Sequence, residues 1–220
     1  MIQAVIFNLD GVLVATDTCH YQAWAQLAKE QGLPFNDQIF ERMQGMKRMD
    51  SLRMLLKRAE RNYSVGEVFA LSARKNDIFN ELILGLKPNG REVNRRALGM
   101  IQQLRDMGIK TAVASSSENA GGILRQLHLE ALFDVIVDGG EISKGKPDPE
   151  VFFLTARRLA VPTANCLVVE NCRSGVEAAR QCGMRVLGLG SQSLNSQSDW
   201  WAENLDAVDL QSLVLQEEMA

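Results

Sequence analysis

The chain has 220 residues, of which 46% are hydrophobic and 23% are charged, so it has enough apolar side chains to form a folded core. Its formal net charge of −3 excludes a basic surface for nucleic acid or anionic lipid, and no apolar run reaches the ~18–20 residues of a membrane span. Its four cysteines have no CxxC or zinc-ligand spacing, and its N-terminus predicts a strand rather than a signal peptide. We therefore expect reduced thiols and a cytoplasmic location.

The apolar pattern along the chain predicts a doubly wound α/β fold. A short buried strand is expected at 4–7, followed by a purely helical stretch from 18 to about 86. After a turn at 87–90, strands alternate with amphipathic helices, which is typical of a parallel sheet. The later strands are expected at 109–114, 135–137, 166–169 and 186–189, the helices at 97–107, 119–127, 149–159 and 175–182, a polar loop at 191–198, and a strand remnant plus a helix at 205–215.

This pattern predicts a core built from two separate parts of the chain. The α/β core comprises residues 1–15 and 92–220, and a helical cap of residues 16–91 is inserted after the first strand. We expect the protein to be a monomer.

Polar side chains follow each predicted strand, where a doubly wound sheet binds ligands. They are Asn8, Asp10 and Thr16 after the first strand; Ser115, Ser116 and Asn119 after the second; Lys146 before the helix at 149; and Glu170 and Asn171 after the fourth. Hydroxyls and helix N-termini bind phosphate oxygens, a lysine balances their charge, and carboxylates bind Mg²⁺ or move protons. The alternative is that the Ser and Asn residues only cap helices.

Four of these segments together resemble the haloacid dehalogenase superfamily and, within it, the β-phosphoglucomutase-like subgroup. The segments are FNLDGVL at 7–13, ASS at 114–116, KPDP at 146–149, and VEN at 169–171 with GVEAA at 175–179. The resemblance implies that position 8 forms an aspartyl phosphate and that Asp10 is the general acid and base. It implies that Ser115 and Lys146 hold the phosphoryl group. Positions 8, 10, 170 and 171 would hold Mg²⁺.

The predicted cap carries a second part of the resemblance. His20, Trp24, Arg48 and Lys75, with Thr16 at the start of the cap and Ser116 and Asn119 from the core, match substrate-binding positions. In the subgroup these residues close over a sugar phosphate, and Arg48 would bind the distal phosphate. The implied reaction converts β-glucose 1-phosphate to glucose 6-phosphate. The alternatives are that Trp24 belongs to the cap core, that Arg48 and Lys75 are solvated charges, and that His20 packs or caps a helix.

The departures from the family pattern fall on the chemistry. Asn8 replaces the nucleophilic aspartate, Asn171 replaces a metal-binding aspartate, Ala15 replaces a further acid, and Arg95-Arg96 stand where the family has Pro-Gly. An amide is a far poorer nucleophile than a carboxylate and a weaker Mg²⁺ ligand. We therefore expect little or no turnover, weakened Mg²⁺ binding and retained binding of a small-molecule sugar phosphate. Three hypotheses follow: an impaired β-phosphoglucomutase-like enzyme, a sugar-phosphate phosphatase, and a non-catalytic phosphosugar-binding or regulatory protein.

Overall fold

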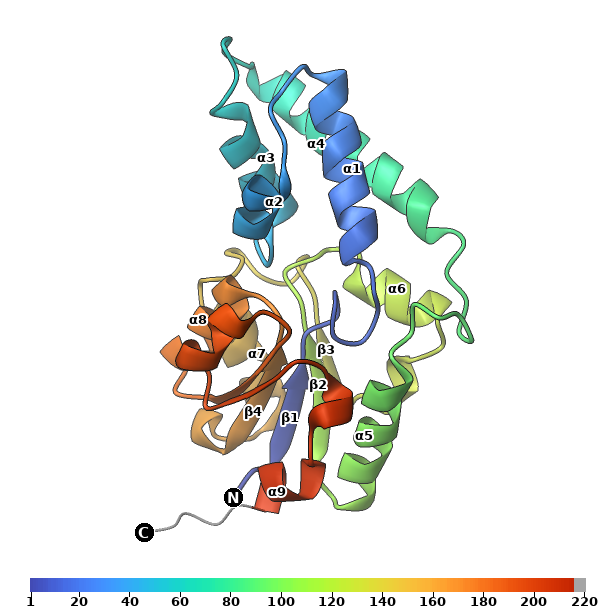
Figure 1. The fold of residues 1–220 in the computed structure, drawn as a ribbon, viewed down its shortest axis with the longest axis vertical. Coiled ribbons are helices and arrows are strands. Elements are labelled where there is room, and N and C mark those ends of the chain that lie inside the picture. The colour runs from blue at the N-terminus through green and yellow to red at the C-terminus, as the bar shows by residue number, and fades with distance from the viewer. Residues whose placement is uncertain (216–220) are drawn as a thin grey trace.

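A parallel sheet with helices on both faces forms the core of the molecule (Figure 1). The computed structural model describes residues 1–215. Within them the strands are β1 (Ala4–Phe7), β2 (Lys110–Ala114), β3 (Val135–Val137), β4 (Cys166–Glu170), β5 (Arg185–Leu189) and β6 (Trp200–Ala202). Their order is β3-β2-β1-β4-β5-β6, and every pairing is parallel. The winding direction reverses between β1 and β4, so a ligand site is expected at the carboxyl ends of these two strands.

Successive side chains of β1 face opposite sides of the sheet, and both sides are buried, which explains why its apolar run is continuous. Val5 and Phe7 face one core, and Ala4 and Ile6 face the other. Helices α5 (Arg95–Asp106) and α6 (Ala120–Gln126) cover the first face, while α7 (Glu150–Leu159) and α8 (Arg173–Gln181) cover the second. A strand buried on both faces carries no polar alternation, as the sequence pattern indicated.

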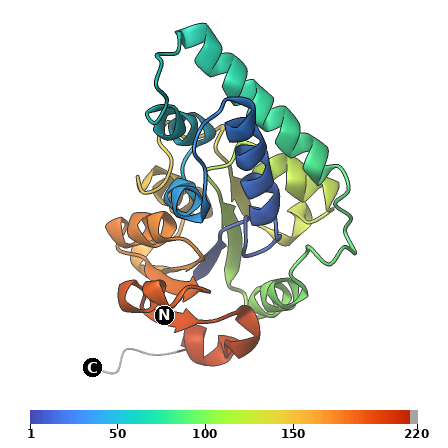
Figure 2. The same cartoon turned by 45° about the horizontal axis from the view of Figure 1, so that its top comes forward.

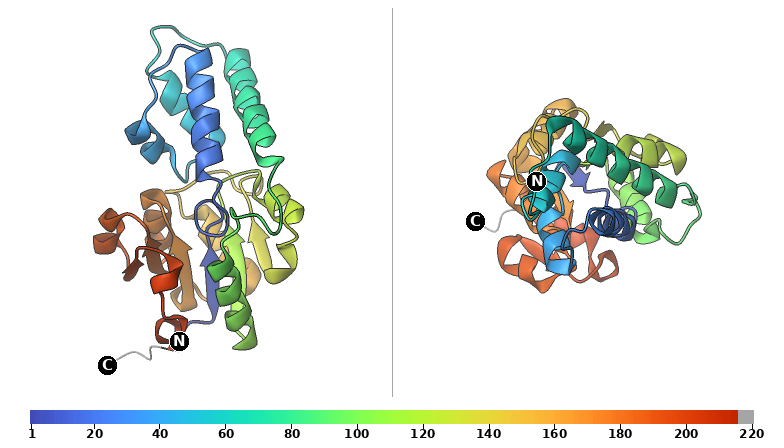
Figure 3. Two further views of the ribbon diagram at one scale, coloured as in Figure 1. Left: turned by 45° about the vertical axis from the view of Figure 1, so that its right-hand side comes forward. Right: turned by 90° about the horizontal axis from the view of Figure 1, so that it is seen from above.

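Four helices form a cap beyond the carboxyl edge of the sheet (Figures 2 and 3). They are α1 (Asp17–Glu30), α2 (Asp37–Met43), α3 (Arg48–Leu56) and α4 (Val65–Ile83). The two chain segments that enter and leave the cap lie side by side, because Val14 pairs with Val93 and the Ala15 N–H donates to the Glu92 carbonyl at 2.8 Å. The cap is thereby tied to the residues that directly follow β1.

The last part of the described chain differs from the expected pattern. The predicted polar loop contains a 3-10 helix over Gln192–Gln197, and the edge strand β6 follows it. The predicted strand remnant at residue 205 is instead a 3-10 helix, Leu205–Ala207, followed by α9 (Leu210–Leu215). The other three-residue edge strand, β3, is a continuous β-branched run and was predicted, whereas β6 has the sequence Trp-Trp-Ala and gave no such signal. No helix within residues 1–215 is both long and apolar enough to cross a membrane.

Candidate functional site

The predicted site residues converge on one pocket between the sheet and the cap. Asn8 comes directly after β1, Glu170 ends β4, Ser115 follows β2, and Lys146 precedes α7. The pocket is lined by most residues singled out in the sequence: Asn8, Asp10, His20, Trp24, Arg48, Lys75, Ser115, Ser116, Asn119, Lys146 and Asn171. Thr16 and Glu170 lie beneath it and are fully buried.

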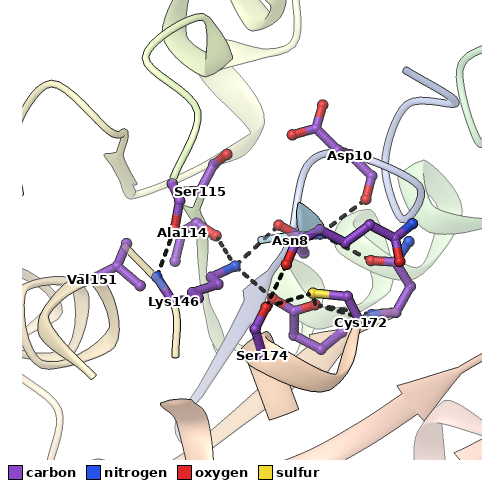
Figure 4. A network of polar contacts seen from close by, with 12 residues as sticks. Asn8, Asp10, Ala114, Ser115, Lys146, Val151, Cys172 and Ser174 are labelled. Carbon is purple, nitrogen blue, oxygen red and sulfur yellow. Dashed lines mark hydrogen bonds and ion pairs between the residues drawn. The ribbon is translucent and has the colours of Figure 1, made fainter. Parts of the chain in front are cut away.

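A buried ion pair forms the floor of the pocket (Figure 4). The Lys146 ammonium lies 2.5 Å from Glu170 Oε1, and both side chains are at most 1% exposed. Lys146 also donates to Asn8 Oδ1 at 3.2 Å and to the Ala114 carbonyl at 3.1 Å. The other Glu170 oxygen accepts from the backbone N–H of Asn171 at 3.0 Å. The carboxylate is therefore saturated by protein donors, as a buried charge requires.

The backbone around Lys146 and Ser115 is held by hydroxyl groups. Ser116 Oγ accepts from the Lys146 N–H at 3.1 Å, which fixes the loop that carries the lysine. Ser115 Oγ accepts from the Ser117 N–H at 3.1 Å. Ser115 thereby presents its hydroxyl group at the pocket wall, near the lysine, in an arrangement suited to an anionic oxygen.

Two amide side chains continue the polar network. Asn8 Nδ2 donates to the Asp10 carbonyl at 2.9 Å and to Asn171 Oδ1 at 3.0 Å. Asn171 Nδ2 in turn donates to Asp17 Oδ2 at 3.2 Å. Because a lysine only donates, Lys146 sets the orientation of the Asn8 amide, and the Asn8 NH₂ group in turn sets that of Asn171.

This orientation bears on the predicted magnesium ligands Asn8, Asp10, Glu170 and Asn171. Mg²⁺ requires oxygen atoms that point inward at near-octahedral positions. Here the Asn8 NH₂ group points at the Asp10 carbonyl and the Asn171 carbonyl oxygen, and Lys146 takes one Glu170 oxygen. Within residues 1–215, no three His, Cys, Asp or Glu side chains are grouped to hold a metal ion. The residues present do not fit Mg²⁺ in this arrangement.

Asp10 has its own partners on the cap side. Its carboxylate accepts from Thr16 Oγ1 at 2.5 Å and lies 3.5 Å from His20 Nε2. His20 Nδ1 lies 2.8 Å from the Lys75 ammonium, so Nδ1 accepts and the proton resides on Nε2, facing Asp10. Burial and the nearby Lys75 charge lower the pKa of His20, which favours this neutral form. Asp10 and His20 form an acid/base pair at the pocket wall.

Lys75 is not a solvated charge. Lys75 is 2% exposed, and its ammonium lies 5.1 Å from the Trp24 ring and 4.6 Å from the Phe79 ring. Burial, followed by the charge of Arg48, lowers the pKa of Lys75 to about 7. Trp24 belongs to the cap core and also lines the pocket. His20 stacks on Phe79 at 4.0 Å between ring centroids, so it packs as well as facing Asp10.

Sequence reasoning missed two acidic residues of the pocket, Asp17 and Glu118. Burial and then the nearby Asp10 raise the pKa of Asp17 to about 7. Asp17 directly precedes the predicted helical stretch, where an acidic residue is ordinarily assigned to the helix dipole, so its position gave no other signal. Glu118 pairs with Arg48 across the pocket rim, a contact that depends on how the cap docks. Ala15, noted as a lost acid, is exposed and does not line the pocket.

Comparisons with known proteins agree with this geometry. A family model described as "Hydrolase: haloacid dehalogenase-like hydrolase" matches residues 2–183. A β-phosphoglucomutase of Bacillus subtilis is 38% identical over 191 residues, covering 86% of this chain and 83% of that protein. A phosphorylated carbohydrates phosphatase of Thermotoga maritima is 35% identical over 192 residues, covering 85% of each. The crystal structure of a β-phosphoglucomutase from Clostridium difficile superposes with a TM-score of 0.91 at 28% identity, covering 97% of this chain and 96% of that one.

Proposed function

Because the chain belongs to the haloacid dehalogenase-like hydrolase family, we propose that it binds a sugar phosphate in the pocket between sheet and cap and turns it over slowly or not at all. The relatives named as a phosphoglucomutase and as a carbohydrate phosphatase support a phosphorylated sugar as the ligand. The pocket supports the same class, since it combines a buried lysine and hydroxyl groups with an aromatic and cationic cap.

The single observation that carries the proposal is the hydrogen bonding of Asn8. In the family, the residue after β1 attacks phosphorus through an anionic oxygen. The amide oxygen of Asn8 is neutral and already accepts from Lys146, and its NH₂ group faces two oxygens. It lacks the negative charge that makes a carboxylate oxygen a nucleophile, and one of its two lone pairs already accepts from Lys146. The proposed binding does not depend on a cation, because the groups around Asn8 do not fit one.

The remaining polar groups are suited to binding. The Ser115 hydroxyl would contact the phosphate oxygens, and Lys146, whose three N–H donors already have protein acceptors, would supply positive charge from beneath. Asp10, held by Thr16 and facing His20, would accept a hydrogen bond from a sugar hydroxyl. Lys75 and Trp24 would cover the sugar from the cap side.

The test is a comparison of the wild-type chain with the double variant Asn8→Asp/Asn171→Asp. Both proteins are assayed with Mg²⁺ on β-glucose 1-phosphate and on a panel of sugar monophosphates. We expect the double variant to be faster by at least ~10³-fold, since it regains the nucleophile and a metal-binding carboxylate. Glucose 6-phosphate as product would indicate a mutase scaffold, and inorganic phosphate would indicate a phosphatase scaffold.

The matched control is Asn80→Asp, which makes the same chemical change at an exposed position of α4. It is expected to leave turnover at the wild-type level. Wild-type turnover equal to that of the double variant would contradict the proposal, because Asn8 would then be no obstacle to the reaction.

A further inference from the structure

Each of the three nitrogen atoms of the Arg48 guanidinium has a protein partner. Its Nε donates to Ser72 Oγ at 3.2 Å, Nη1 donates to Asn76 Oδ1, and Nη2 forms an ion pair with Glu118 Oε2. The first two partners lie on α4, beside Arg48 in the cap, whereas Glu118 belongs to the core. The positive charge that the sequence suggested for a distal phosphate therefore already faces a carboxylate.

The backbone that carries Glu118 is fixed in place. Glu118 lies between β2 and α6, and its neighbour Asn119 donates to Asn76 Oδ1 at 3.0 Å. On the other side, Gly139 approaches so closely that an added Cβ would lie 2.2 Å from the Ser116 carbonyl oxygen and 2.9 Å from the Glu118 nitrogen. Arg48 and Glu118 both line the pocket, so their ion pair lies where the outer end of a bound sugar would be.

We propose that Glu118 determines the ligand class by occupying the second anionic subsite, so that the pocket accepts sugar monophosphates and disfavours bisphosphates. This inference rests on the proposed function. A second phosphate at Arg48 would have to displace the Glu118 carboxylate and then remain beside it, with like charges at short range. A sugar hydroxyl has no such penalty and can accept from Arg48 or donate to Glu118.

A pocket that selects against a second phosphate favours some phosphoryl-transfer reactions over others. Moving a phosphoryl group from the enzyme to a second hydroxyl of a sugar monophosphate produces a sugar with two phosphates. A pocket that disfavours a second phosphate suits reactions of monophosphates, in which water takes up the phosphoryl group. Glu118 therefore favours the phosphatase type of scaffold over the mutase type.

The experiment is calorimetric titration with glucose 6-phosphate and with glucose 1,6-bisphosphate. It compares the wild-type chain, Glu118→Gln and the control Glu203→Gln, which removes the same charge at an exposed position outside the pocket. The readout is the ratio of the two dissociation constants. We expect the wild type and the control to bind the bisphosphate no more tightly than the monophosphate, and Glu118→Gln to shift the ratio toward the bisphosphate by ~10-fold or more.

Two results would overturn the inference, and they are distinguishable. A ratio that is the same in all three proteins would show that Glu118 does not select the ligand, while leaving sugar-phosphate binding intact. Failure of all three proteins to bind either ligand, with melting curves that show a folded chain, would contradict the proposed function itself and this inference with it.

Discussion

At the scale of single residues, Asn8, Asn171 and Asp17 depend on one another. The Asn171 carbonyl accepts from Asn8, and its NH₂ group donates to the Asp17 carboxylate. An aspartate at position 171 would place a second carboxylate against Asp17 and leave the Asn8 NH₂ group as its compensating donor. The amides of Asn8 and Asn171 and the Asp17 carboxyl group thus form a hydrogen-bonded set that needs no added cation.

The first prediction concerns Asp17→Asn. Burial and Asp10 raise the pKa of Asp17 from 3.8 to about 7, so the folded chain keeps this carboxyl protonated where the unfolded chain ionises it. The free energy of unfolding of the wild type should therefore decrease as pH rises from about 4 to about 7. The variant has no carboxyl group at position 17, so it should not show this decrease. The stability gain of the variant should grow over that range to about 1–3 kcal/mol and then level off. Urea unfolding at several pH values measures it.

The control for this prediction is Asp37→Asn, which alters the exposed first residue of another cap helix, α2. It should show no comparable gain between pH 4 and 7. If Asp17→Asn raised the free energy of unfolding by the same amount at every pH, the gain would not come from removing the ionised carboxyl group. That result would contradict the prediction.

At the scale of elements, the turn from β4 into α8 fixes the floor of the pocket. Gly175 lies in the first turn of α8, and a Cβ at this position would lie 2.1 Å from the Glu170 carboxyl carbon. This close approach lets the helix start directly over the buried carboxylate that binds Lys146. Glycine is therefore required here because no side chain fits between α8 and the Glu170 carboxylate, and not because of an unusual backbone conformation.

The second prediction follows for Gly175→Ala. The added methyl group must push the Glu170 carboxylate off Lys146 or shift α8, so the variant should lose about 2–4 kcal/mol of unfolding free energy. The matched control is Gly99→Ala, at an exposed position of α5 where a Cβ meets nothing within 4 Å. That change should stabilise the chain by ~0.5–1 kcal/mol through helix propensity. Equal effects in chemical denaturation would contradict the packing argument.

Most elements were predictable because their signals are local. The buried run of β1, the helical period of the cap and the glycine that follows α5 each depend on a few neighbouring residues. The residues at strand ends were predictable as a group, because parallel strands bring their carboxyl ends to one edge. Strand β6 carried no such signal. Asp17 and Glu118 could not be assigned to the pocket either, since their partners Asn171 and Arg48 are distant in sequence.

At the scale of the whole molecule, the cap contacts the core directly around the pocket. The Lys47 ammonium donates to the Ile142 carbonyl at 2.6 Å, and Ser174 Oγ donates to the Gln44 carbonyl at 2.7 Å. With the Arg48–Glu118 ion pair, these contacts join α3 and the loop before it to two core loops and to the first turn of α8. The pocket is therefore enclosed by protein groups from both parts, and its own amide and lysine donors bind the oxygens that a cation would otherwise bind.

The most direct test of this account is the effect of Mg²⁺ on ligand binding. Glucose 6-phosphate is titrated calorimetrically into the wild-type chain, once with excess EDTA and once with millimolar Mg²⁺. Because the Asn8 NH₂ group occupies the position between the predicted ligand oxygens, the affinity should agree within about threefold, less than ~1 kcal/mol. Binding that is detectable only with Mg²⁺, or Mg²⁺-dependent release of phosphate during the titration, would contradict it.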